Sequence, residues 1–222
     1  MLYFDYAATT PMSPAALQAY QKTAVSFYGN TQGLYDLGTN TANVVQSCRA
    51  LFSEWLQADK EGIFFTGSAS EANSLAIFGA LEARPPEQRH VLYSPLEHPS
   101  VMMAVQKAER WLGAKGIELP LNKEGMVEVH EVERAINHDT GLIVMSHIAS
   151  ETGFTQPVQA VGQLVNHTPI HFHVDASQSF GKYSVFQPAL YFDSCTLSAH
   201  KFYGPKGVGI AYISPTATFH PF

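Results

Sequence analysis

Lys201 stands in the segment LSAHKFYGPKGVG (residues 197–209), where aromatic, glycine and proline residues follow an apolar stretch. A solvated surface lysine needs no such surroundings. Crowding and partial desolvation lower the pKa of an amine, and a neutral amine can attack an aldehyde. The segment therefore indicates a lysine that anchors a carbonyl compound as a Schiff base.

Three other polar clusters also follow apolar stretches. In FFTGSASEANSLAIFGA (64–80), small residues precede a helix opened by Ser70 and Glu71, which favours a phosphate site or, alternatively, an ordinary capped turn. Asp175 ends the stretch HFHVD, where a carboxylate is either a cap or the partner of a protonated ring nitrogen. His98, in SPLEHPSV, is either structural or catalytic. An amine, a carboxylate and a phosphate-binding helix end together are what pyridoxal phosphate requires.

Helical and strand-like patterns alternate along the chain and position these clusters. The patterns predict helices over 14–23, 43–56, 70–83, 99–112, 128–137 and 158–167, and strands over 62–66, 90–94, 141–147, 170–175, 195–200 and 207–213. Continuous apolar strands between helices are typical of a mostly parallel sheet covered on both faces, an α/β/α three-layer domain. Ligands bind at the carboxyl ends of such strands, where the clusters lie.

The composition argues against several classes of partner. Hydrophobic residues make up 45% of the 222 residues and charged residues only 14%, below the usual value of about 25%. We therefore expect a partner subunit or a further domain to cover part of the surface. A net charge of −6 argues against nucleic acid and anionic membranes, and the absence of a signal peptide or long apolar run predicts a soluble cytoplasmic protein. Two cysteines far apart predict neither a disulfide framework nor a metal site.

In their order, these motifs resemble the class V aminotransferase family and, within it, the cysteine desulfurases. The resemblance extends over nearly the whole chain, and its pieces are YFDYAATTP, YGN, FFTGSASEANSLAI, LEHPSV, ETG, HVDASQSFGK and SAHKFYGPKGVG. It implies a pyridoxal-phosphate-dependent transferase of fold type I. Residues 14–222 are expected to form the large cofactor-binding domain, and residues 1–13 to pack with a small C-terminal domain that is missing from this chain.

The resemblance also implies a role for each site residue. Lys201 is expected to anchor the cofactor and then move the Cα proton of the substrate, while His98 stacks on the ring and acts in acid–base steps. Asp175 is expected to pair with the ring nitrogen, and Gln178 with the ring hydroxyl. The residues expected to hold the phosphate are Ala69, Ser70, Ser198 and His200.

Several positions depart from the family pattern. Ala149 and Ser150 stand where the family has two asparagines, the second of which touches the cofactor, so Ser150 is expected to make that contact in a lost or shortened form. The pair Gly67–Ser68 reverses the usual order, and Tyr35 replaces a common histidine. Because of these changes, the sequence does not decide which amino acid is the substrate.

The two cysteines do not fit the family's sulfur-accepting residue. Cys48 shares a helix face with Val44 and Phe52 and is expected in the core, while Cys195 lies within a predicted strand. In the family, the persulfide-forming cysteine and the arginine that binds the substrate carboxylate both lie in the C-terminal part, which these 222 residues do not include. Neither cysteine is therefore expected to be the nucleophile.

The resemblance implies conversion of L-cysteine to L-alanine, with the sulfur passed to an enzyme cysteine as a persulfide for Fe–S cluster or thiocofactor synthesis. The alternatives are a selenocysteine lyase, a small-amino-acid aminotransferase, or a truncated cofactor-binding scaffold without activity. A homodimer is the expected assembly, with a sulfur-acceptor or scaffold protein as a further partner. The chain alone is expected to be inactive, to bind the cofactor weakly and to self-associate.

Overall fold

The computed structural model describes residues 2–221, so Met1 and Phe222, at the ends of the two expected domains, lie outside the described residues. Its centre is a seven-stranded sheet in the order β1-β7-β6-β5-β4-β2-β3. The strands are β1 (Ile63–Thr66), β2 (His90–Tyr93), β3 (Lys115–Glu118), β4 (Thr140–Ser146), β5 (His171–Asp175), β6 (Ser194–Ser198) and β7 (Gly209–Ile213). β7 runs antiparallel to β1 and β6, and the other paired strands are parallel. The predicted mostly parallel sheet is confirmed.

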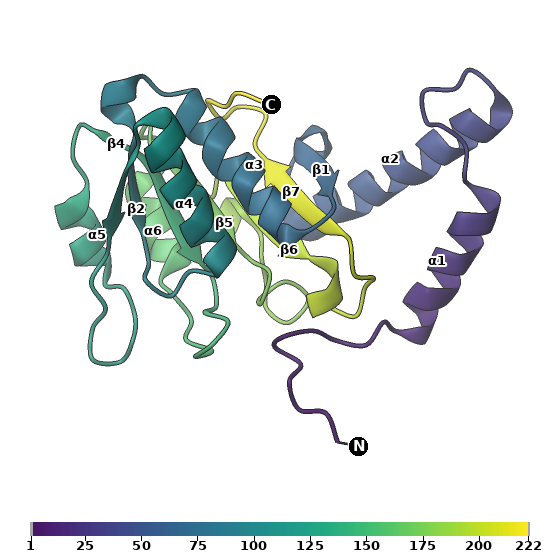
Figure 1. Ribbon diagram of the computed structural model, residues 1–222, viewed down its shortest axis with the longest axis horizontal. Helices are drawn as coiled ribbons and strands as arrows, with labels where there is room; N and C mark the ends of the chain where they lie inside the picture. The colour runs from purple at the N-terminus through teal and green to yellow at the C-terminus, as the bar shows by residue number, and fades with distance from the viewer. Residues whose placement is uncertain (1, 222) are drawn as a thin grey trace.

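Helices cover both faces of this sheet (Figure 1). They are α1 (Pro14–Ser26), α2 (Asp36–Leu56), α3 (Ala69–Glu82), α4 (Pro99–Leu112), α5 (Val129–Ala135), α6 (Val158–Val165) and α7 (Gln187–Leu190). α3 and α4 pack against one face, and α5, α6, α7 and the end of α2 against the other. The predicted α/β/α three-layer architecture is therefore confirmed, and none of the helices within residues 2–221 is long and apolar enough to cross a membrane.

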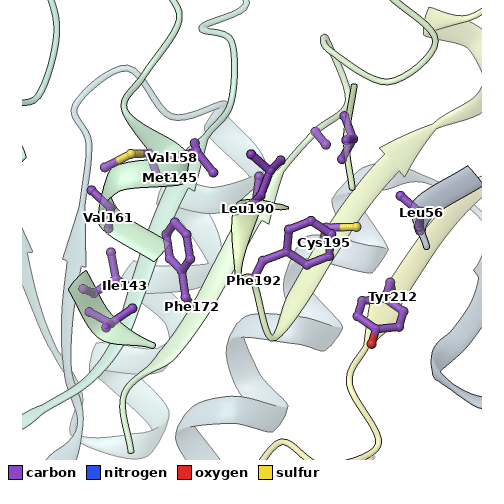
Figure 2. Packing of buried hydrophobic residues seen from close by; sticks show 14 of the residues in the cluster. Leu56, Ile143, Met145, Val158, Val161, Phe172, Leu190, Phe192, Cys195 and Tyr212 are labelled. Carbon is purple, nitrogen blue, oxygen red and sulfur yellow. The ribbon is translucent and has the colours of Figure 1, made fainter. Parts of the chain in front are cut away.

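Two hydrophobic clusters hold the layers together. Leu142 and Val144 of β4 pack towards α3 and α4, whereas Ile143 and Met145 of the same strand belong to the opposite cluster. In that second cluster, Phe172 lies beside residues of α6 (Figure 2). Successive side chains of a strand point to opposite faces, so a strand covered on both sides must be apolar throughout. This explains the unbroken apolar sequence of β4.

α1 and the first part of α2 project away from the sheet (Figure 1). No residue of α1 is buried, and within α2 only Gly38 and Leu56 are. Cys48 lies in this helix and is only half-buried, so the prediction that it belongs to the core is wrong. The reason is that most of α2 has no layer of the domain beside it.

The N-terminal segment returns to the body of the domain along the loop that carries Lys201. The Thr10 N–H donates to the His200 carbonyl at 2.8 Å, and the Ser13 N–H donates to the Tyr203 carbonyl at 3.0 Å. The Tyr203 N–H in turn donates to the Thr10 hydroxyl at 2.8 Å. These bonds fix residues 10–13 against the loop that carries Lys201, and packing of this segment with a small domain stays a prediction.

Candidate functional site

A cavity of about 240 Å³ lies at the carboxyl ends of β4, β5 and β6, beside the start of α3. All of the expected site residues line it: Ala69, Ser70, His98, Ser150, Asp175, Gln178, Ser198, His200 and Lys201. The lining also includes Ala8, Ser68, Ser100, Ser146, Ile148 and Ser177, which the sequence analysis did not assign to a site. Residues far apart in the sequence meet here because the parallel strands end at one edge of the sheet.

Lys201 ends a short 3-10 helix (Ala199–Lys201) directly after β6. Its Nζ donates to the Ala7 carbonyl at 2.5 Å, so the N-terminal segment holds the amine in place. Burial lowers the pKa of Lys201, and the positive charge of Lys182 lowers it further, while Asp175 and Asp5 act in the opposite direction. A lowered pKa increases the fraction of neutral, nucleophilic amine near neutral pH.

Asp175 ends β5 and is buried. One carboxylate oxygen, Oδ2, accepts a hydrogen bond from the Asn73 side-chain amide at 2.9 Å, and Oδ1 accepts one from the Ser177 N–H at 2.9 Å. The second bond is the local cap considered from the sequence, and the first is a long-range contact that the sequence could not reveal. Asp175 is thus a buried carboxylate, held from two sides, that borders the cavity.

His98 is the N-cap residue of α4 and is itself exposed. Its Nδ1 accepts a hydrogen bond from the Ser100 N–H at 3.1 Å and lies 2.8 Å from the Ser100 hydroxyl. The structural and the catalytic readings of His98 are therefore compatible, since capping uses Nδ1 only. Within residues 2–221, no side chain or carbonyl forms a hydrogen bond with Nε2.

The start of α3 is arranged as an anion site. Ser68 is the N-cap, not Ser70, and its hydroxyl accepts from the Glu71 N–H at 3.1 Å. The Glu71 carboxylate reaches back to the Gly67 N–H at 2.7 Å. In the described part of the chain, no hydrogen bond satisfies the N–H groups of Ala69 and Ser70, and both residues line the cavity. Unpaired N–H groups at the positive end of a helix suit a phosphate.

The remaining expected residues lie around this start of α3 and the mouth of the cavity. Ser198 ends β6 and is buried, and His200 follows it with Nδ1 3.0 Å from the Thr9 hydroxyl. Burial, together with Lys201 and Lys206, lowers the pKa of His200. The Gln178 side-chain amide donates to the Ala7 carbonyl at 2.9 Å. Ser150 lies in the turn after β4, on the edge of the cavity.

Glu97 is a buried acid beside the cavity wall that the sequence analysis did not single out. Its two carboxyl oxygens contact the N–H and the hydroxyl of Ser146, each at 2.7 Å. Burial raises the pKa of Glu97 to about 8, the negative charge of Asp175 adds to the rise, and the bonds from Ser146 oppose it. These contacts tie the loop before His98 to the end of β4.

The residues around the cavity fit pyridoxal phosphate. The unpaired N–H groups of Ala69 and Ser70 match a phosphate, the Asp175 carboxylate matches a protonated ring nitrogen, and Lys201 supplies an amine of lowered pKa. Ser177 adds a buried hydroxyl that has no partner in the described part of the chain.

Comparison with known proteins agrees with this fit. A family model described as "Aminotransferase class-V" matches residues 2–221. The chain belongs to the class V aminotransferase family. Pyridoxal phosphate dependence, which the resemblance implied, follows from this membership.

Curated relatives of this family member carry the names of desulfurases. A protein of Halalkalibacterium halodurans named "Putative cysteine desulfurase NifS" is 38% identical over 225 residues, which cover 100% of this chain and 58% of the relative. A Bacillus subtilis protein with the same name is 34% identical, covering 100% of this chain and 56% of the relative. The chain thus spans little more than half the length of these relatives.

Solved structures resemble this class V domain closely. One described as "SspA in complex with cysteine" superposes with a TM-score of 0.94 at 32% identity, covering 100% of this chain and 64% of that one. An apo cysteine desulfurase from Thermococcus onnurineus NA1 has a TM-score of 0.90 at 26% identity, covering 99% of this chain and 56% of that one. The fold-type I assignment rests on these structures as well as on the sheet order.

Proposed function

We propose that residues 2–221 form the cofactor-binding part of a cysteine desulfurase. The observation that carries the proposal is one cavity lined by Lys201, Asp175, His98 and the unpaired N–H groups at the start of α3. The desulfurase names of the relatives, and the cysteine bound to a structure of the same fold, support cysteine as the substrate.

Each residue has a distinct task in this proposal. Lys201 supplies the amine that anchors the aldehyde, Asp175 faces the ring nitrogen, and Ala69, Ser70, Ser198 and His200 hold the phosphate. When bound, pyridoxal phosphate supplies an electron sink for the bond that breaks at the substrate Cα. Lys201 then takes and returns the Cα proton at Nζ, which its lowered pKa favours. His98 covers the ring and offers Nε2 for proton transfer.

The sulfur acceptor is proposed to lie outside these residues. Cys195 is fully buried in β6, and burial raises its pKa, which disfavours the nucleophilic thiolate. Cys48 lies on α2 and is not among the residues that line the cavity. In this proposal the cysteine that receives the sulfur lies in another part of the whole protein, and alanine is the second product.

The same reasoning extends to partners. Exposed aromatic and aliphatic residues are numerous on α1, on the connection to α2 and at the end of α2, including Tyr20, Tyr28, Leu34, Tyr35 and Trp55. A large exposed apolar surface is typical of an interface, which supports the proposed homodimer. A sulfur-acceptor or scaffold protein and a cytoplasmic location stay predictions.

The test mixes the purified chain with pyridoxal phosphate and records the visible absorption spectrum, with Lys201→Ala as the control. Wild type is expected to gain the visible band of a lysine-bound cofactor, and the variant is expected to lack it. Identical spectra contradict the proposal. Adding cysteine, selenocysteine or alanine to the gene's full-length product then separates a desulfurase from a selenocysteine lyase and an aminotransferase, because each consumes a different substrate.

A further inference from the structure

Asn73 is a polar residue on the sheet-facing side of α3, with no exposed surface. Its neighbours one turn along the helix, Ala76 and Ile77, are equally buried and apolar. A buried amide is costly unless its hydrogen-bonding groups are satisfied. Asn73 meets this condition through three side chains, two from β5 and one from α4.

The three hydrogen bonds connect Asn73 to both flanks of the cavity. Its Nδ2 donates to Asp175 Oδ2 at 2.9 Å and to the Ser100 hydroxyl at 3.1 Å. The same Ser100 hydroxyl lies 2.8 Å from His98 Nδ1. On the other side, Asn73 Oδ1 lies 3.0 Å from His173 Nε2. The Asn73 amide therefore contacts the Asp175 carboxylate directly and the His98 ring through the Ser100 hydroxyl.

The orientation of the amide follows from its partners. A carboxylate accepts hydrogen bonds only, so the NH₂ group must face Asp175, and the carbonyl oxygen must face His173. His173 is buried and its pKa is lowered to about 4, so its ring is neutral and carries one proton, on Nε2. Its Nδ1 then accepts from the Ser194 hydroxyl at 2.8 Å, and that hydroxyl accepts from His171 Nε2 at 2.8 Å.

The chain His171–Ser194–His173–Asn73–Asp175 thus has one direction, with every hydrogen bond donated towards the cavity. We propose that Asn73 is a positioning residue, which fixes the Asp175 carboxylate for the ring nitrogen and, through Ser100, fixes the His98 ring. The inference rests on the proposed function. It adds a residue that does not line the cavity but is bonded to Asp175 directly and to His98 through Ser100.

The test compares Asn73→Ala with Ser74→Ala, a matched control one residue along α3 that is not among the cavity lining. Losing a hydrogen bond to a charged group is expected to weaken pyridoxal phosphate binding by about ten- to a hundredfold. The pH at which the visible band titrates is expected to shift as well, because Asp175 is then held less firmly. Circular dichroism first establishes that each variant is folded. Wild-type affinity and an unchanged titration in folded Asn73→Ala contradict the inference.

A double-mutant cycle with Asp175→Ala separates positioning from general destabilisation. If Asn73 acts through Asp175, its replacement costs much less affinity when the carboxylate is already gone. An equal loss with and without Asp175 contradicts the inference. Should Asn73→Ala fail to fold, Ser100→Ala removes the connection to His98 and leaves the bond between Asn73 and Asp175. A several-fold loss of affinity is expected, and no change contradicts that half of the inference.

A measurement without cofactor keeps the two proposals apart. In the wild-type chain, both Asn73 side-chain amide protons are expected as separate, slowly exchanging NMR signals, since both are buried and bonded. Rapid exchange contradicts the network whether or not the chain binds pyridoxal phosphate. Conversely, a wild type that gains no visible band contradicts the proposed function and leaves this signal unaffected.

Discussion

Glu97→Gln tests the electrostatics of the cavity wall. Burial raises the pKa of Glu97 from 4.5 to about 8. Between these values the folded chain keeps a proton that the unfolded chain has released. The free energy of unfolding therefore falls as the pH rises through this window, and the contribution of Glu97 is fully present only at lower pH. One pKa unit corresponds to about 1.4 kcal/mol, so the ionisation of Glu97 lowers the free energy of unfolding by roughly 4 kcal/mol between pH 5 and pH 8.

Glutamine keeps the shape of Glu97 and does not titrate. Its carbonyl can accept from the Ser146 N–H, and its NH₂ group can donate to the Ser146 hydroxyl, so both contacts are preserved. The unfolding free energy of Glu97→Gln relative to wild type is therefore expected to rise by about 1.4 kcal/mol per pH unit from pH 5 to pH 8, and then to level off.

The assay is denaturant unfolding followed by circular dichroism at a series of pH values, with slopes compared between variants. Glu87→Gln is the matched control, because Glu87 is exposed, and its difference from wild type is expected to stay flat. A flat difference for Glu97→Gln over the same range would refute the reasoning, since it would mean that the folded chain does not retain the proton.

Two further predictions concern the start of α3 and the buried histidines. In Gly209→Ala, the new Cβ would lie 2.3 Å from the backbone of Ser68, so the turn must shift; denaturant unfolding is expected to report a loss of about 1–3 kcal/mol, and pyridoxal phosphate binding to weaken, whereas unchanged values contradict the close contact. Burial lowers the pKa of His171 to about 3 and of His173 to about 4, both from 6.5. The stability that these neutral histidines contribute is therefore fully present above pH 6.5 and is lost as the pH decreases towards 4. The free energy of unfolding of His173→Asn should fall less steeply with decreasing pH than that of wild type, and an equally steep fall contradicts the lowered pKa of His173.

The sequence predicted the elements that are long or apolar throughout. β4 was evident because a strand covered on both faces must be largely apolar, and β5 was predicted although His171, His173 and Asp175 interrupt its apolar pattern. β3 (KGIE) was missed because it is a partly exposed edge strand without a clear pattern, and α7 because it has only four residues. The antiparallel direction of β7 was not predictable either, since strand direction depends on pairing and not on local sequence.

Site residues that directly follow a strand could be predicted from the sequence, whereas residues that act through long-range contacts could not. Asp175, Ser198 and Lys201 converge because parallel strands end at one edge. Asn73 lies 102 positions from Asp175, and its only sequence signal is an amide within the apolar pattern of α3. Ser70 was taken as the possible cap, whereas Ser68 is the cap, because a boundary shift of two residues moves the N-cap.

The central claim is that Lys201 anchors pyridoxal phosphate in this cavity. The most direct measurement incubates the chain with the cofactor, reduces the lysine-bound form with borohydride, and locates the modified lysine by proteolysis and mass spectrometry. We expect the label to lie on the peptide that contains Lys201 and to disappear in Lys201→Ala. A label on Lys182, or one spread over surface lysines at the same level in wild type and variant, would contradict it.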